Sequence, residues 1–327
     1  MDLSLVFLGT GGSVPTARRA TACLLIRAGG ARIMVDCGEG SQRQMIRSIG
    51  LVPVDEIYIT HYHADHYLGL PGLLKTYDLQ GRERPLRLFG PPGLLELFAA
   101  LRRIFGRLSY EVELVELDPQ GVAEHEGFGI RSFPVKHRMR AYGYALVEPE
   151  RPGRFDANRA QELGIADPRD YGRLQRGEVV ATANGEVHPE QVLGEPRRGR
   201  KLVITGDSAP CEAIRVAAHQ AELLVADGSF AEAERERAAE TGHSTARQAA
   251  ELAREADVSM LALVHVSSRY NVAEVVAEAA GIHPNVHAPR DFDLAEIPYR
   301  ERGAPRLIEN GARQTQEPRA EPVPRSP

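Results

Sequence analysis

The sequence predicts an α/β domain in which helices cover a β-sheet. The main observation is a series of short apolar, β-branched runs, each stopping abruptly at a polar residue, which alternate with helical patterns. Such alternation is typical of a sheet with helices packed on its faces. At 327 residues, with 43% hydrophobic and 26% charged side chains, the chain can bury a large core.

Five apolar runs are predicted to be buried strands, and each leads to a residue that can bind a metal or carry a proton. In chain order they are "EIYIT" before His61, "IRSFPVK" before His137, "KLVITG" before Asp207, "ELLVA" before Asp227 and "MLALV" before His265. Helices are predicted at 92–105, "PGLLELFAALRRIF", and at 244–256, "STARQAAELAREA". Because strand ends in such folds meet at one rim, we expect the five polar side chains to converge.

One domain is expected over residues 1–310, with an insertion of about residues 150–200 protruding from it. The insertion is rich in Pro, Gly and Arg and lacks long apolar runs, which favours an arm or, taken alone, a solvated loop. It ends in "RRGRK", where Arg197 and Arg198 are candidate substrate-binding residues. Residues 311–327 contain few apolar side chains and are predicted to form a disordered tail.

Hydropathy, cysteine content and charge argue against several classes of protein. No apolar run reaches the roughly 18 residues of a membrane helix, and "MDLSLVFLGTGG" is predicted to be a strand rather than a signal peptide, so a cytoplasmic location is expected. The three cysteines are far apart, which argues against disulfides and thiolate zinc sites. The net charge of −5 disfavours a nucleic-acid partner only mildly, since binding needs a local basic patch.

The densest cluster of possible metal ligands is "THYHADH", with His61, His63, Asp65 and His66. In an extended turn alternate side chains share one side, so His61 and His63 can bind one ion. A helix beginning near Asp65 would direct Asp65 and His66 to a second ion. Imidazole and carboxylate without sulfur suit zinc or manganese in a catalytic site. A single histidine would more simply be a hydrogen-bonded core or surface residue, but this cluster is predicted to bind metal.

The stretch "THYHADHYLGLPGLL" resembles the H-x-H-x-D-H motif of the metallo-β-lactamase superfamily. Further segments, over residues 1 to about 275, narrow the resemblance to the ribonuclease Z family of endonucleases, which trim the 3′ end of precursor tRNA; they include "FLGTGGSVPT", "DCGEGSQRQM", "VKHRMRAYGYAL", "GHSTARQAAELA" and "LVHVSSRY". The resemblance implies an αββα sandwich with a protruding arm. It also implies a homodimer in which the arm of one subunit serves the site of the other.

Carried over position by position, the resemblance implies two zinc ions per chain, with manganese as an alternative. One ion would be held by His61, His63 and His137. The other would be held by Asp65, His66 and His265, and Asp207 would bridge the two. The sequence departs from the family pattern in "VADGSF", where Asp227 stands for a glutamate, and in the arm, which lacks a Gly-Pro pair. The remaining histidines match no motif and are predicted to be structural or surface residues: His125, His188, His219, His283 and His287.

A metal-activated hydroxide is expected to attack phosphorus, with Asp65 orienting it and accepting its proton. His243, in "TGHST", is the candidate acid for the leaving 3′ oxygen, and Asp227 could hold its other nitrogen. Alternatively, His243 is a residue of the N-cap region before the helix at 244–256 and has no role in catalysis. Arg269 could contact phosphate or form a surface ion pair. Ser13 and Thr16 lie in a turn that could approach the site.

These features predict a zinc-dependent endoribonuclease that removes 3′ trailers from precursor tRNA and leaves a 3′-hydroxyl. The first alternative is a phosphodiesterase of the same fold that acts on a small phosphodiester, an enzyme that would have no use for the arm. The second is a metal-stabilised RNA-binding protein without catalysis. The presence of both Asp65 and His243 argues against it, because binding alone requires neither.

Overall fold

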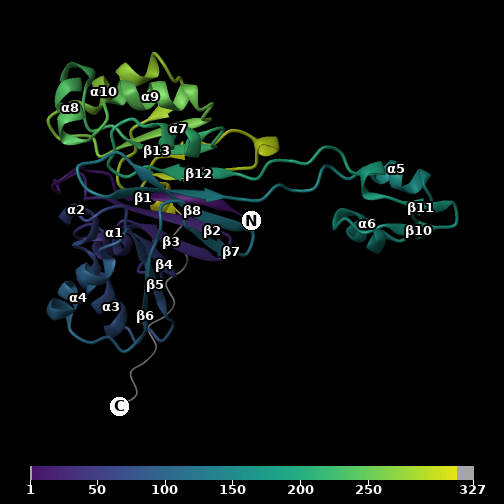
Figure 1. The fold of residues 1–327 in the computed structure, drawn as a ribbon, viewed down its shortest axis with the longest axis horizontal. Helices are drawn as coiled ribbons and strands as arrows, with labels where there is room; N and C mark the ends of the chain where they lie inside the picture. Colours follow the sequence, from purple (N-terminus) through teal and green to yellow (C-terminus); the bar gives the residue numbers. More distant parts are fainter. Residues whose placement is uncertain (1, 315–327) are drawn as a thin grey trace.

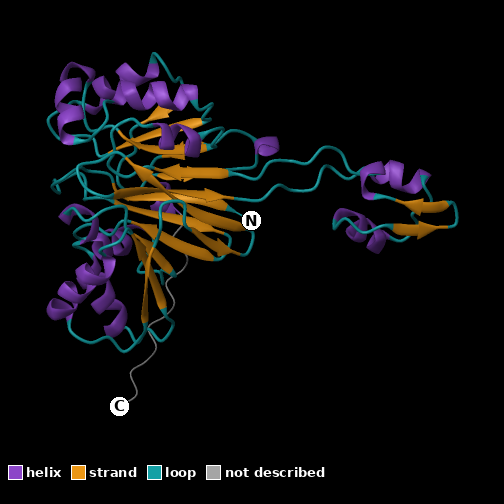
Figure 2. Ribbon diagram, viewed as in Figure 1, coloured by secondary structure: helices purple, strands orange, loops and turns teal. Residues whose placement is uncertain are grey.

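Two β-sheets pack face to face, and helices cover the outer side of each (Figure 2). The computed structural model describes residues 2–314. The first sheet contains, side by side, β17 (Arg306–Ile308), β16 (Leu294–Glu296), β1 (Leu3–Gly9), β2 (Cys23–Ala28), β3 (Ala31–Val35), β4 (Glu56–Tyr58), β5 (Leu86–Gly90) and β6 (Val112–Glu116). The second contains β15 (Val286–His287), β14 (Met260–Val264), β13 (Leu223–Asp227), β12 (Lys201–Ile204), β9 (Ala141–Val147), β8 (Phe128–Val135) and β7 (Val122–His125). The predicted αββα sandwich is confirmed.

Continuous apolar strands form this fold because both faces of each sheet are buried. On β1, Leu5 and Phe7 face the other sheet, whereas Val6 and Leu8 face the helices. The layer between the sheets also contains Tyr58, whose ring stacks on Phe89. A strand buried on both sides cannot alternate between apolar and polar residues, which explains the unbroken runs in the sequence.

The helices divide between the two outer faces. Those against the first sheet are α1 (Ser41–Ser48), α3 (Leu70–Leu79) and α4 (Leu94–Phe105), and those against the second are α7 (Glu212–Ala218), α9 (Ala246–Glu255) and α10 (Val272–Ala280). Two shorter helices, α2 (Ala64–Tyr67) and α8 (Arg235–Thr241), lie at the strand ends. On α9, Ala249, Ala250 and Ala253 face the core, so the helix can approach its sheet closely. Both helices predicted at 92–105 and 244–256 are present as α4 and α9.

Residues 150–200, which we call the arm, extend away from the sandwich between β9 and β12 (Figure 1). The arm contains α5 (Ala157–Glu162), α6 (Pro168–Gln175), a hairpin of β10 (Val180–Thr182) and β11 (Gly185–Val187), and a short 3₁₀ turn, Pro189–Gln191. Its interior is a small apolar cluster that includes Ile165, Leu174, Val180 and Val187. The interpretation of this segment as a solvated loop is therefore wrong, because its scattered apolar residues meet in a core of their own.

The described chain ends in α11 (Gly311–Gln314), and Ala312 is buried against the body. The predicted tail, which was drawn from residue 311, therefore overlaps an ordered helix for its first four residues. Its remainder, residues 315–327, lies outside the described residues. Between residues 2 and 314, no helix has both the length and the apolar character that crossing a membrane requires.

Candidate metal centre and active site

The predicted metal ligands meet at one edge of the sandwich because the strands that carry them end there. β12, β13 and β14 are parallel, and β8 runs in the same direction because both β8 and β12 are antiparallel to β9. His137, Asp207 and His265 follow β8, β12 and β14 at this edge. From the other sheet, β4 leads into His61 and His63, and α2 carries Asp65 and His66. The expected convergence of strand-end side chains is present.

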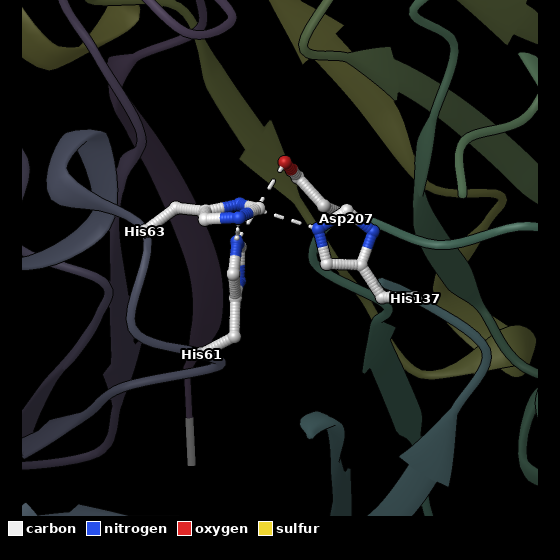
Figure 3. Close-up of side chains that lie close together, drawn as sticks. All are labelled: His61, His63, His137 and Asp207. Atoms are coloured by element: carbon white, nitrogen blue, oxygen red, sulfur yellow. Dashed lines mark hydrogen bonds and ion pairs between the residues drawn. The ribbon is translucent and has the colours of Figure 1, made fainter. Parts of the chain in front are cut away.

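The first donor group consists of His61, His63, His137 and Asp207, and their side chains point toward one another in Figure 3. Nδ1 of His63 lies 3.0 Å from Nε2 of His61 and 3.3 Å from Nε2 of His137. Oδ2 of Asp207 lies 3.8 Å from Nε2 of His61. In a tetrahedral site with zinc–nitrogen bonds near 2 Å, ligand atoms stand about 3.3 Å apart. The donor atoms are therefore spaced as ligands of one ion.

The second donor group consists of Asp65, His66 and His265. Oδ2 of Asp65 lies 3.5 Å from Nε2 of both histidines. Asp207 also contacts this group, with Oδ1 at 3.4 Å from Nε2 of His66 and Oδ2 at 3.2 Å from Nε2 of His265. Asp207 is thus the one carboxylate among these residues that faces both groups.

His66 provides the test of whether these residues fit a metal. Its ring is buried, and Nε2 has no hydrogen-bond partner among the described residues. Burial by itself lowers the pKa of His66, but the charges of Asp36 and Asp207 outweigh it and raise that pKa well above its ordinary value. A buried nitrogen without a hydrogen-bond partner, between carboxylates that favour positive charge, is what a cation ligand requires. The donor set therefore fits metal binding.

A second layer of contacts, which sequence reasoning missed, orients the ligands. Asp36 follows β3 and lies with Oδ2 2.7 Å from Nδ1 of His66, while its Oδ1 accepts from the backbone N–H of Thr60. The carbonyl oxygen of Gly242 lies 2.8 Å from Nδ1 of His137. Such contacts fix which ring nitrogen faces the metal. Asp36 could have been found, because "ARIMVD" is an apolar run ending in an acid like the five runs that were recognised.

Half-buried His243 and buried Asp227 form a pair beside the second donor group. Nδ1 of His243 lies 2.7 Å from Oδ2 of Asp227, and the ring of His243 stacks on that of His265 with centroids 5.2 Å apart. Burial works to lower the pKa of His243, but the hydrogen bond and charge of Asp227 raise it on balance. The cap of α9 is Thr245, whose side chain accepts from the N–H of Gln248, so His243 has no capping role.

Ser229 joins this pair to the donor groups. Its hydroxyl donates to Oδ1 of Asp227 at 2.6 Å and lies 2.8 Å from Nδ1 of His265. A single hydroxyl can donate to the carboxylate while it accepts from the imidazole N–H. Neither Ser229 nor the backbone N–H of Ser208, which donates to Asp227, was predicted, because nothing in the local sequence marks them.

The turn that follows β1 reaches the site, as expected. The backbone N–H of Ser13 donates to Oδ2 of Asp65 at 3.0 Å, and the same nitrogen lies 3.2 Å from Nε2 of His265. The turn therefore packs against the second donor group. The five histidines that matched no motif belong to none of the donor groups found within residues 2–314.

The structure pairs the three candidate substrate-binding arginines with other side chains. Arg269 lies 2.9 Å from Glu234. It therefore forms a surface ion pair, which was one of the two roles expected for it. Arg197 contacts Glu301, and Arg198 contacts Gln220. Arg197 and Arg198 precede β12, whereas Asp207 follows it. These two arginines therefore lie at the base of the arm and not beside the donor groups.

Comparison with known proteins agrees with these observations. The model of the metallo-beta-lactamase superfamily matches residues 16–219. The chain is 43% identical to "Ribonuclease Z" of Methanosarcina acetivorans, covering 91% of this chain and 99% of that protein, and 46% identical to "Ribonuclease Z" of Myxococcus xanthus, covering 82% and 88%.

Among solved structures, the short form of human tRNase Z matches with a TM-score of 0.66 and 25% identity, covering 90% of this chain and 99% of that one. A metallo-beta-lactamase fold protein of Bacillus subtilis matches with a TM-score of 0.67 and 18% identity, covering 90% and 100%, which supports the fold alone. The chain belongs to the ribonuclease Z family of the metallo-beta-lactamase superfamily.

Proposed function

We propose that this protein is a metal-dependent endoribonuclease that removes 3′ trailers from precursor tRNA and leaves a 3′-hydroxyl on the tRNA. The observation that carries the proposal is the meeting of two donor groups through Asp207, beside a histidine whose Nδ1 is held by a buried carboxylate. Membership of the ribonuclease Z family supports precursor tRNA as the substrate. We expect the activity in the cytoplasm, where such precursors would be available to it.

We propose that the first donor group holds one ion and the second group another, with Asp207 shared and zinc as the expected metal. Ions held there would supply Lewis acidity at the scissile phosphate and neutralise charge that develops on its oxygens. Five imidazoles and two carboxylates without sulfur suit zinc or manganese. The atoms that would bind are the ones already described, Nε2 of His61, His66, His137 and His265 and Nδ1 of His63 among them.

The chain's own residues would move the protons. Water adds to phosphorus as the bond from phosphorus to the 3′ oxygen breaks, and the leaving oxygen takes a proton. We assign that donation to Nε2 of His243, because Nδ1 is occupied by Asp227. Asp65, whose Oδ2 accepts from the backbone of Ser13, is assigned to orient the attacking water and accept its proton.

The direction of β9 supports a homodimer. β9 begins at Ala141, which pairs with Val135 near His137, and its seventh and last residue is Val147, next to the arm. Seven residues of strand span roughly 20 Å, so the arm leaves from the end opposite the metal donors. We propose that the arm of one subunit contacts tRNA bound at the donor groups of the other.

The test is a pair of assays with purified protein. One measures cleavage of a precursor tRNA with mapping of the new ends, and the other measures turnover of a small chromogenic phosphodiester. We expect efficient precursor cleavage at one position, giving a 3′-hydroxyl on the tRNA and a 5′-phosphate on the trailer. Turnover of the small phosphodiester without precursor cleavage would overturn the proposal in favour of a small-substrate phosphodiesterase.

A further inference from the structure

A cavity of about 690 Å³ lies on the far side of the turn that carries Ser13. Its walls are residues 15–20 of that turn, one face of α1, and residues 290–292. Ser13 donates to Asp65, so only a short stretch of backbone separates the cavity from the second donor group.

Exposed arginines dominate the walls of this cavity. Arg18, Arg43, Arg47 and Arg290 line it and are exposed, and we call it the arginine cavity. Arg313 stands beside it, with its guanidinium carbon 4.5 Å from the centre of the Phe292 ring. None of these five guanidinium groups forms an ion pair with another residue of the 2–314 range.

The carboxylates nearby do not neutralise the cavity. Asp291 is buried and already accepts from the hydroxyl of Thr10, the backbone of Ala20 and the amide of Gln44. Glu39 is the exposed carboxylate among the lining residues. Four exposed cations therefore face one exposed anion in a concave surface.

Some arginines elsewhere on this surface are paired, whereas others within residues 2–314, such as Arg102, Arg103 and Arg254, are exposed without an ion pair but do not line this cavity. In the arm, Arg169, Arg173 and Arg176 each contact a carboxylate within the arm, and on the body Arg215, Arg247 and Arg306 do the same with neighbouring glutamates. In a chain whose net charge is −5, unpaired arginines collected in one cavity indicate an anionic ligand. A row of guanidinium groups is suited to the phosphates of a nucleic-acid backbone.

The ring of His265 separates the two sides of the centre. Its Nδ1 faces Ser229 and the pair of Asp227 and His243, whereas its Nε2 faces Asp65 and the turn. His243 is assigned to the leaving 3′ oxygen, which belongs to the tRNA, so the tRNA body lies on its side. In an in-line displacement the attacking water, which Asp65 would orient, lies opposite the leaving 3′ oxygen. The 5′ oxygen that continues into the trailer then lies to the side of that line, from where the trailer can run along the turn.

We propose that the arginine cavity binds the phosphodiester backbone of the 3′ trailer, downstream of the cleavage site. The proposal rests on the proposed function for the direction of the RNA. It implies that trailers long enough to enter the cavity bind more tightly than very short ones, and that this advantage weakens with salt.

The experiment compares one precursor tRNA with a trailer of about two nucleotides and the same tRNA with about twelve, a length that grooves for single strands can cover. The cavity variant combines Arg43→Ala, Arg47→Ala and Arg290→Ala. The control variant loses the same charge at paired sites through Arg215→Ala, Arg247→Ala and Arg306→Ala. Melting temperatures show whether each variant is folded.

We expect the cavity variant to raise the KM for the long-trailer precursor by about tenfold or more, and to flatten the slope of log KM against log salt by about two, as loss of three contacts to a single strand predicts. The short-trailer precursor and the control variant should keep the wild-type KM. An equal rise with both trailers would mean that the cavity contacts the tRNA body, and an unchanged KM would mean that it contacts no RNA. Either result overturns the proposal.

A direct binding measurement separates this proposal from the proposed function. If the wild-type protein cleaves neither precursor, the function has failed, and fluorescence anisotropy with a free RNA of the trailer sequence then decides on the cavity. Weaker binding by the cavity variant than by the control variant would support an RNA-backbone site. Equal binding by both would eliminate it.

Discussion

Nδ1 of His243 lies 2.7 Å from Oδ2 of Asp227, a carboxylate that is itself buried. Asp227 is held in place by the backbone N–H groups of Ser208 and Ser229. An ionised carboxylate in this position requires the hydrogen on Nδ1, which leaves Nε2 as the atom that exchanges protons with substrate. The pair is therefore built to present a proton donor in a fixed orientation.

The first prediction concerns the pH dependence of cleavage. Asp227 raises the pKa of His243 against the effect of burial, so His243 keeps its proton to a higher pH than it would alone. Asp227→Asn removes that charge and lowers the pKa. The fall of kcat on the alkaline side should therefore begin at a lower pH in the variant than in the wild type. A profile of kcat against pH measures this. An alkaline limb at the same pH in both proteins would show that Asp227 does not set the pKa of His243.

The second prediction separates proton transfer from metal binding. His243→Ala should lower kcat for precursor tRNA by about 10²–10⁴-fold, the usual contribution of a general acid, with metal content unchanged. Asp65→Ala should abolish cleavage, because Asp65 belongs to the second donor group and also contacts Ser13. Single-turnover kinetics alongside elemental analysis gives both quantities. Wild-type cleavage by the His243 variant would show that another group donates the proton.

The third prediction concerns Asp36, which holds Nδ1 of His66 at 2.7 Å. Asp36→Asn should weaken metal binding by about 10–100-fold, the usual cost of losing an outer partner of a ligating histidine. Competition with a chromogenic chelator measures the affinity. Asp55→Asn is the matched control, since Asp55 pairs with Arg84 at a more exposed position of the same sheet. Equal affinities for the two variants would argue that His66 does not bind metal.

The fourth prediction concerns the arm. Replacement of residues 152–196 by a short Gly/Ser linker is feasible because Arg151 and Arg197 already pair across the base of the arm. The KM for precursor tRNA should rise strongly and depend less on salt, because phosphate contacts are lost. Turnover of a small phosphodiester should persist. Precursor cleavage at the wild-type KM would mean that the arm has no part in substrate binding.

The α/β class and the strand-end metal donors could be predicted from the residues because that information is local, whereas the sandwich of two sheets was expected only from the family resemblance. Strand-end residues such as His137, Asp207 and His265 follow apolar runs that are buried on both faces, and the direction of those strands brings their ends together. Asp36 was missed although it has the same local pattern. Ser229 was missed because its role depends on His265, which is 36 residues away in the sequence.

Features that depend on distant partners or on scattered apolar residues could not be predicted from the sequence. The stretch around Arg197 and Arg198 has the composition of a phosphate site, but Glu301 and Gln220 engage these arginines from other parts of the chain. The arm was open to interpretation as a loop because Leu174 and Val187 stand alone among polar residues, and only folding brings them into one cluster.

The most direct test of the account is the metal content of the protein. Two donor groups that share Asp207 should hold two ions per chain, so elemental analysis of protein purified without chelator should give a ratio close to two. Dialysis against a chelator should remove the ions and the cleavage activity together, and added zinc or manganese should restore both. A reproducible ratio near one that added metal does not raise, in protein that is fully active, would contradict the dinuclear centre.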